Sequence, residues 1–375
     1  MEKQMTRITG LAAAIDFTAS LWQDGTVSIA GKGVRSGRVK KKEIEAFSDV
    51  VQIAAGESSG VAALTEQGTV LLAGLARYDK WRHAVSKWEK IAFIALDDHC
   101  LAGVDTAGNV VVVGDEETPD IAHWQNMQKI ALYGAFAVGV KKDGTVQTSG
   151  YHERNYWLDE LKQWQDITDV AIGSQYSVAG STLFVAGLKK DGSVVCAAKY
   201  PVFEQQIEAW REMKALYGGM RYALLGLKKD GTIAVYQSHG ESLDALQALR
   251  CVTSLTASEN FAAAVCEDHL AGVGDSDCFE DLALRPSAAQ ARAVALERAQ
   301  KRGKWISGIA AGVGAVLIAV IWLTGVLRGY AVTMPSGAVI ASAPVFFSVL
   351  IALICAVVIC FAWPEQERKK PVSKN

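Results

Sequence analysis

The chain has 375 residues, of which 38 are Lys or Arg and 40 are Asp or Glu, giving a net charge of −2. This balance provides no overall attraction to nucleic acid, and the length leaves room for two or three domains. The seven cysteines are odd in number and scattered along the chain. They argue against a disulfide framework and favour buried, reduced thiols in a reducing compartment.

The N-terminal three quarters of the chain repeats one short phrase. Its clearest copies read GVKKDGTV, GLKKDGSV and GLKKDGTI, with looser copies before them and a degenerate one after them. The seven copies end at Val27, Val70, Val110, Val146, Val194, Ile233 and Gly274. A period of about forty residues indicates an array of one supersecondary unit, and such arrays usually serve as binding surfaces.

Each copy predicts a β-hairpin, because Asp-Gly tolerates the positive φ angles of a two-residue type I′ turn. A second phrase lies upstream, as in VQIAAG ending at Gly56 or TDVAIG ending at Gly173, and is typical of a further strand closed by a glycine. About forty residues with three or four strands is the size of one propeller blade. A bulky aromatic residue often precedes the upstream strand, at Phe47, Trp88, Trp124, Trp164 or Trp210.

Seven such units predict an all-β fold, a seven-bladed β-propeller over residues 8–275, because seven hairpins close well as a ring around a channel. An open β-solenoid is the alternative, although its coils are normally shorter.

The runs of the form hydrophobic-x-x-D-G-T-V-x-x-x-G are clearest at residues 24–31, 67–74 and 143–150. They resemble the regulator-of-chromosome-condensation repeat family, and the resemblance covers about residues 8–275. It implies a seven-bladed propeller. It implies no single activity, because family members serve as nucleotide-exchange factors, enzyme inhibitors and scaffolds. The Trp-Gly that often ends the family's hairpin is Ala-Gly at residues 30–31 and 73–74, which weakens any transfer of the exchange-factor activity.

The rest of the chain predicts a membrane anchor. Residues 276–304 form an acidic linker and an amphipathic juxtamembrane helix rich in alanine. Residues 305–327 and 338–363 contain no charged side chain, and about 20 apolar residues span a bilayer core, so both are expected to be transmembrane helices. A short loop joins them, and residues 364–375 form a basic tail.

Basic residues flank this predicted hairpin on both outer sides, whereas its loop has only Arg328. The positive-inside bias therefore places the propeller and both termini in the cytoplasm, with a bacterial-type cell membrane as the expected location. The first ten residues contain no apolar signal segment that would export the propeller. The basic residues expected at the membrane surface are Arg298, Lys301, Arg302 and Lys304.

Neither predicted span carries an ionisable side chain, so the hairpin is expected to anchor the protein rather than to transport a solute. Gly308 and Gly312 form a Gly-x-x-x-Gly step, which can pack the hairpin on itself or pair two protomers in a homodimer. In a span rich in glycine the step can equally arise by chance.

No pattern of a catalytic, metal or cofactor site is present. The six histidines form no i, i+4 pair, and neither a phosphate-binding loop nor a Gly-x-Ser-x-Gly elbow occurs. We therefore expect no metal, no cofactor and no enzymatic activity. An enzyme or exchange factor acting at the propeller channel is the alternative, as is a structural subunit of a membrane complex.

Two sets of residues are candidates for binding a protein partner. Lysine pairs precede three successive hairpin turns and predict a basic arc for an acidic partner or anionic lipid, although lysine at exposed turns also serves solubility. The arc comprises Lys141, Lys142, Lys189, Lys190, Lys228 and Lys229. Aromatic residues between the blades can anchor an interface or pack the blades, and the candidates are Tyr78, Trp81, Tyr151, Tyr156, Trp157 and Tyr200. Together these features predict a membrane-anchored propeller that acts as a protein-interaction or scaffolding module.

Overall fold

The structure is a computed structural model of the chain. It describes residues 7–56, 60–74, 76–150, 157–177, 180–199, 201–218, 222–239, 242–266, 269–279, 282, 305, 308–309, 311–322, 331–333, 336 and 339–362. The chain divides into two compact units. One is Thr6–Arg285, and the other combines Met1–Met5 with Pro286–Asn375.

The first unit is a β-propeller. Seven three-stranded antiparallel sheets are described in it, and each contains three consecutive strands, so each sheet is one blade. The blades in chain order are β1 Ile8–Ala13, β2 Thr18–Trp22 and β3 Val27–Ala30; β4 Val50–Gly56, β5 Gly60–Thr65 and β6 Val70–Ala73; β7 Ile91–Leu96, β8 Cys100–Asp105 and β9 Val110–Gly114; β10 Met127–Tyr133, β11 Phe136–Lys141 and β12 Val146–Ser149; β13 Ile167–Ser177, β14 Gly180–Lys189 and β15 Val194–Ala198; β16 Met213–Tyr217, β17 Ala223–Lys228 and β18 Ile233–Gln237; β19 Val252–Ala257, β20 Phe261–Cys266 and β21 His269–Gly274.

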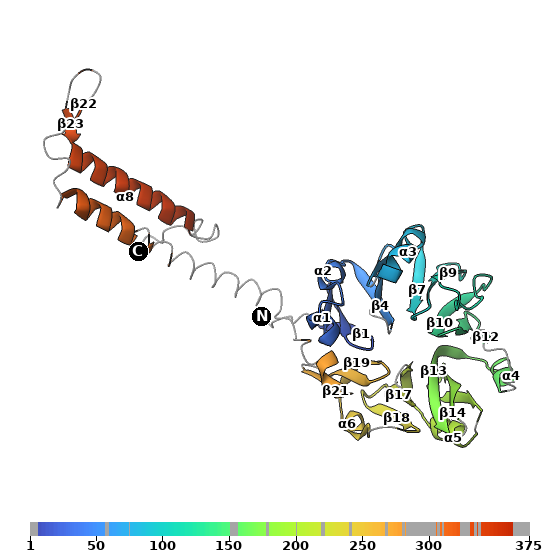
Figure 1. The fold of residues 1–375 in the computed structure, drawn as a ribbon. Helices are drawn as coiled ribbons and strands as arrows, with labels where there is room; N and C mark the ends of the chain where they lie inside the picture. The colour runs from blue at the N-terminus through green and yellow to red at the C-terminus, as the bar shows by residue number, and fades with distance from the viewer. Residues whose placement is uncertain are drawn as a thin grey trace. The chain divides into compact units, whose positions relative to one another are not determined.

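The first strand of every blade lies innermost. Each first strand neighbours the first strand of the next blade, from β1 to β4 and onward to β19, and β19 lies against β1. The ring is therefore closed, as Figure 1 shows. Short helices join the blades: α1 Lys32–Arg35, α2 Lys41–Ile44, α3 Ala76–Val85, α4 Leu158–Leu161, α5 Pro201–Glu208 and α6 Asp244–Gln247. The seven units predicted from the sequence are confirmed as seven blades.

The hairpin turn differs from the predicted two-residue type I′ turn. In the fourth blade Gly144 N–H donates to the Lys141 carbonyl, and Lys141 N–H donates to the Thr145 carbonyl. Only Gly144 has a positive φ, at 83°, while Asp143 does not. These bonds define a three-residue loop with the glycine in the left-handed conformation. The aspartate carboxylate also accepts hydrogen bonds from the threonine that follows the glycine.

The four predicted tryptophans pack on glycines of the second strand of their own blades, whereas Phe47 packs in the apolar cluster between blades 1 and 2. Trp164 lies so close to Gly187 that a Cβ there would be 2.7 Å from the indole ring. The same pairing recurs for Trp88 on Gly103, Trp124 on Gly139 and Trp210 on Gly226. An indole needs a flat surface without a side chain beneath it, so each tryptophan fixes a glycine in the neighbouring strand.

Two boundaries differ from the prediction. Strand β13 continues through Gly173 to Ser177, so that glycine does not close the strand. The propeller also extends beyond residue 275, because Cys278, Phe279 and Leu282 are buried in it. The predicted acidic linker therefore starts with residues that belong to the propeller.

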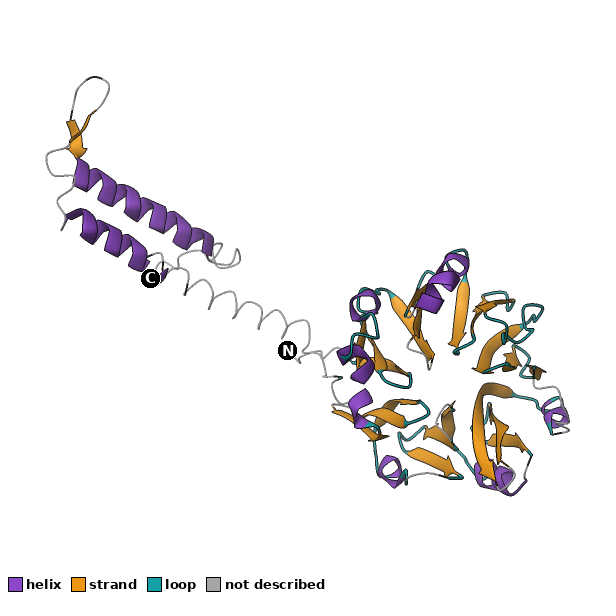
Figure 2. Cartoon of the chain, viewed as in Figure 1, coloured by secondary structure: helices purple, strands orange, loops and turns teal. Residues whose placement is uncertain are grey.

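In the second unit, residues 311–322 are helical, and strands β22 Ala331–Thr333 and β23 Val339–Ser342 pair antiparallel before helix α8 Ala343–Ala362. Figure 2 shows these elements. The second predicted span thus begins with a strand rather than with a helix at residue 338. Within the described residues, the structure contains no helix with both the length and the apolar character needed to cross a bilayer. The two spans stay predictions from the sequence.

Candidate interaction surfaces

The hairpin turns between second and third strands lie on one face of the ring, here called the turn face. Each turn glycine accepts a hydrogen bond from the first strand of the next blade, as Ile167 N–H donates to the Gly144 carbonyl at 3.0 Å. The same bond recurs at 2.9–3.0 Å for the carbonyls of Gly25, Gly68, Gly108, Gly192 and Gly231. These six bonds link the turns of blades 1 to 6 to the first strands of blades 2 to 7.

A second repeated feature was not apparent from the sequence. The residue just before the first strand adopts a positive φ, as at Asp166 with 60°, and its carbonyl accepts a hydrogen bond from the next turn. The equivalent residues are Asp49, Lys90, Asn126, Glu212 and Cys251. These six have no residue type in common, which is why no sequence signal identified them.

The aspartates of the turns are held in one geometry. Asp143 Oδ1 accepts from the Thr145 hydroxyl at 2.7 Å and from Thr145 N–H at 2.9 Å, and Asp191 and Asp230 make the same pair of bonds with Ser193 and Thr232. These donors stabilise the charged form and lower the pKa of all three carboxylates. The hydrogen bond from the hydroxyl makes the larger contribution, and the bond from the backbone N–H makes the smaller one.

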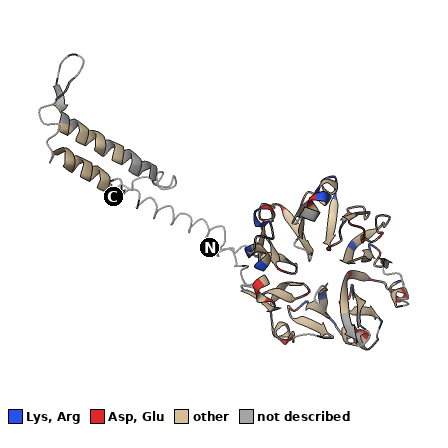
Figure 3. Cartoon of the chain, in the orientation of Figure 1, with Lys and Arg blue, Asp and Glu red and all other residues tan. Residues whose placement is uncertain are grey.

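The basic arc lies on the turn face of blades 4 to 6. Lys142, Lys190 and Lys229 are exposed, and the lysine before each of them is half-buried; Figure 3 colours the charged residues of the ring. Lys142 Nζ donates to the Thr106 carbonyl in the turn of the preceding blade at 3.0 Å. Lys229 Nζ lies 3.5 Å from Glu212 Oε2 and close to the turn at Gly192. The second lysine of a pair can therefore reach back to the previous blade.

Two arginines extend the arc, and sequence reasoning missed them. Arg211 donates to the carbonyls of Glu208 and Trp210, and Arg250 donates in the same way to Gln247 and Leu249. Each guanidinium thus covers the end of a helix and stands near the turn aspartate of the preceding blade, Asp191 for Arg211 and Asp230 for Arg250, whose pKa it helps to lower. A pattern search for lysine pairs could not detect them, because each stands two residues before the first strand of a blade and not beside a lysine pair.

The three aromatic candidates that the structure describes are buried. Tyr78, Trp81 and Trp157 are buried, at 0, 6 and 5% exposure. Tyr78 meets Trp81 edge to face, with ring centroids 5.1 Å apart. These three rings pack the blades, so they offer no surface to a partner in this structure. Tyr151, Tyr156 and Tyr200 lie outside the described residues.

The inner strands carry one ion pair between blades. Lys129 Nζ of β10 is 3.1 Å from Asp169 Oδ1 of β13. Burial, with a smaller contribution from Asp169, raises the pKa of Tyr217 in β16 to about 12, so the phenol stays neutral. Gln52 of β4 bonds with both backbone groups of Ile94 in β7. These polar groups tie neighbouring blades together, and the described residues contain no cluster of metal-ligand type.

The membrane-surface candidates Arg298, Lys301, Arg302 and Lys304 lie outside the described residues. In the second unit, a Cβ at Gly308 or Gly312 would meet nothing within 4 Å, whereas one at Gly314 would meet Cys355 Sγ of α8. Trp322 Nε1 also donates to Ser348 Oγ at 3.1 Å. The helix pair therefore packs through Gly314 and Trp322, and pairing of two protomers through Gly308 and Gly312 stays a prediction.

Comparison with known proteins identifies the fold. No family model matches the chain, and no curated protein sequence matches it. The CRINKLY WD40 ectodomain of the Arabidopsis thaliana receptor kinase ACR4 is 14% identical, with a TM-score of 0.50, covering 72% of this chain and 95% of that one. The C-terminal domain of gp131 from bacteriophage phiKZ is 10% identical, with a TM-score of 0.44, covering 75% and 96%. Yeast RCC1 (Prp20), solved with Kap60, is 12% identical, with a TM-score of 0.39, covering 71% and 69%. At 14% identity, the similarity to the ACR4 ectodomain concerns the fold alone.

Proposed function

We propose that the chain is a protein-interaction module whose propeller binds an acidic partner through the basic arc. The observation that carries the proposal is that three adjacent blades present lysines side by side on the turn face, where the other described turns present none. Charged patches of one sign speed association and select partners of the opposite sign.

The arc favours a protein over a lipid surface as the partner. Its six lysines, Arg211 and Arg250 are interleaved with carboxylates, and the turns that carry them are fixed by the inter-blade hydrogen bonds. A rigid, alternating pattern discriminates between partners that match it and partners of uniform charge. The carboxylates concerned are Asp143, Asp166, Asp191, Glu212 and Asp230.

The module is proposed to be tethered to a membrane from the cytoplasmic side. The support is the sequence: two uncharged runs at residues 305–327 and 338–363, with basic residues on both outer flanks. Membership of the regulator-of-chromosome-condensation repeat family belongs to the same proposal, and it rests on the repeated D-G-T-V runs.

The binding test compares two sixfold Lys→Gln variants of the full chain in detergent, which have equal net charge. One removes the basic arc, and the control removes six exposed lysines elsewhere: Lys40, Lys41, Lys42, Lys80, Lys87 and Lys162. Acidic proteins captured from cytosol should be lost with the arc variant and retained with the control, and capture should weaken with salt. Equal capture by both variants would refute the proposal. Selective loss of binding to anionic vesicles would assign the arc to lipid instead.

The tether has its own test, which does not depend on the partner. A membrane-impermeant thiol reagent applied to intact cells should label a cysteine introduced at Ser336, in the predicted outer loop, and not one introduced at Ser373, in the tail. Labelling of the tail would contradict the cytoplasmic orientation. Recovery of the chain in the soluble fraction would contradict the anchor.

A further inference from the structure

Among the described residues, the ring closes between blades 7 and 1 without a shared strand. Blade 1 consists of β1, β2 and β3, and blade 7 consists of β19, β20 and β21. A strand exchanged between the two ends of the chain would hold this seam by backbone hydrogen bonds, and none of the seven sheets contains one. The seam depends on contacts between side chains and on the segment that follows β21.

The seam itself is unusually polar. Thr18 and Ser20 are fully buried, and they alternate with Trp22 on the face of β2 that packs against Val265 of blade 7. The hydroxyls of Thr18 and Ser258 have no hydrogen-bond partner among the described residues, and unpaired buried hydroxyls are destabilising.

The apolar contacts of the seam are also small. Apart from Cys278, Phe279 and Leu282, which follow β21, its two apolar clusters contain six buried residues, against eight to fourteen in the cluster at each of the other six seams. Burial of apolar surface is the main stabilising contribution. These contacts therefore stabilise this seam less than the corresponding contacts stabilise the seam between blades 1 and 2.

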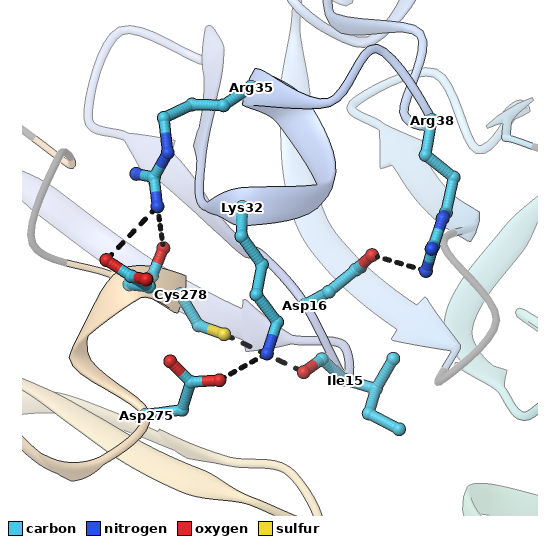
Figure 4. Close-up of polar contacts among 8 residues, drawn as sticks. Ile15, Asp16, Lys32, Arg35, Arg38, Asp275 and Cys278 are labelled. Carbon is cyan, nitrogen blue, oxygen red and sulfur yellow. Dashed lines mark hydrogen bonds and ion pairs between the residues drawn. The ribbon is translucent and has the colours of Figure 1, made fainter.

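Residues 275–279 and 282 cross this seam, and Figure 4 shows the polar contacts of Asp275 and Cys278. Asp275 forms an ion pair with Lys32 of α1. Arg35 Nη2 lies 3.2 Å from Asp277 Oδ1 and donates to the Asp277 carbonyl at 3.3 Å. The 3-10 turn η1 Ser276–Cys278 thus faces α1 with opposite charge.

The segment that crosses the seam also makes apolar contacts with blades 1 and 7. Cys278 is fully buried, with Sγ 3.7 Å from the Ile15 carbonyl. Phe279 stacks on Phe261, with ring centroids 5.8 Å apart, and Leu282 packs with Ile8 and Trp22. Burial raises the pKa of the Cys278 thiol to about 12, so the thiol is unreactive while the segment is in place.

We propose that residues 275–279 and 282 form a latch, which holds blades 7 and 1 together in place of a shared strand and whose release opens the ring at that seam alone. The chain continues from Leu282 into the segment that leads to the second unit, so tension on that segment acts on the latch before any other part of the propeller. The seam is therefore the point at which attachment beyond residue 285 can alter the propeller. The inference concerns the propeller alone and does not depend on the proposed partner.

Cys278 reports directly on the latch. Alkylation of the full chain in detergent is followed by peptide mass spectrometry, with Cys100, buried in blade 3, as an internal measure of global unfolding. Lys32→Asp should accelerate alkylation of Cys278 about tenfold and leave that of Cys100 unchanged, because only local opening is favoured. The double variant Lys32→Asp/Asp275→Lys should return the rate to within about twofold of the parent by restoring the ion pair.

Glu43→Lys is the matched control, since it breaks a similarly exposed ion pair with Arg82 away from the seam and should leave Cys278 unreactive. Arg35→Ala is the milder second variant, expected to accelerate Cys278 about threefold, should Lys32→Asp fail to fold. Equal acceleration of Cys278 and Cys100 would overturn the latch, because it would mean that the ring unfolds as one unit. Unchanged reactivity of Cys278 in both seam variants would overturn it as well.

Discussion

The turn glycines provide the most direct test of how the blades are joined. Gly144 meets two demands: its φ is 83°, and an added Cβ would lie 3.0 Å from both Cα and N of Asp166 in the next blade. The substitution Gly144→Ala therefore adds a conformational penalty and a steric penalty. Gly37 provides the control, because its φ is 74° and a Cβ there would meet nothing within 4 Å.

The two penalties can be estimated separately. A residue with a Cβ in the left-handed region costs about 1–2 kcal/mol, partly offset by the lower entropy of the unfolded alanine chain. Crowding against backbone that cannot easily move adds about 1–2 kcal/mol. We expect Gly37→Ala to lower the free energy of unfolding by about 1 kcal/mol and Gly144→Ala by about 3 kcal/mol.

The assay is equilibrium urea unfolding of residues 1–285, followed by tryptophan fluorescence, with both variants measured beside the parent. The informative quantity is the difference between the two substitutions, since φ is nearly the same at both sites. If Gly144→Ala costs no more than Gly37→Ala, the close approach of turn and neighbouring blade contributes nothing, and the account of how the blades are joined is wrong.

Three further results are expected from the same fragment. Gly187→Ala should destabilise it by about 1–3 kcal/mol, because the new Cβ would lie 2.7 Å from the Trp164 ring; a melting temperature equal to that of the parent would contradict this packing. Thr168→Val should cost about 1 kcal/mol, because the Thr168 hydroxyl donates to the Leu188 carbonyl at 3.2 Å beside a β-bulge; hydrogen exchange at β13 checks it. The lowered pKa of Asp143 means that its turn is stabilised above the ordinary aspartate pKa and loses this stabilisation as the pH falls through the lowered value. Acid titration of Asp143→Asn should therefore show a shallower loss of stability below about pH 4 than that of the parent.

The repeat and the number of blades were predictable because both depend on local chemistry. A glycine that can adopt positive φ between two apolar runs predicts a hairpin wherever it occurs, and seven copies at one period predict a closed ring. The turn type was not predictable, because Asp-Gly suits both two- and three-residue loops. The same three-residue loop forms at Gly68 and Gly108, where Gln67 and Ala107 stand in place of the aspartate, so the bond from the Thr145 hydroxyl to Asp143 supports the loop and does not select it.

Features that join one blade to the next could not be predicted. Asp166 and Cys251 occupy the same strained position and have no chemistry in common. What selects the position is the carbonyl that it presents to a turn, and no side-chain pattern records that. The exposed or buried state of aromatic residues is equally non-local. Trp81 stands in a polar stretch of sequence, yet its ring is buried between blades.

The lysines of the basic arc differ in their contacts, so each has to be considered separately before a function is assigned to the arc. Lys142 donates to the carbonyl of Thr106, so that residue helps to fix the neighbouring turn whether or not a partner exists. Lys190 has the same place in its blade, is exposed, and makes no side-chain bond within the described residues. A lysine without an internal role is one whose charge is available to a partner. If binding is lost when Lys190 is neutralised and stability is unchanged, the arc acts as an interface. If only neutralisation of Lys142 has an effect, and that effect is a loss of stability, the repeated lysines have a structural role in the propeller.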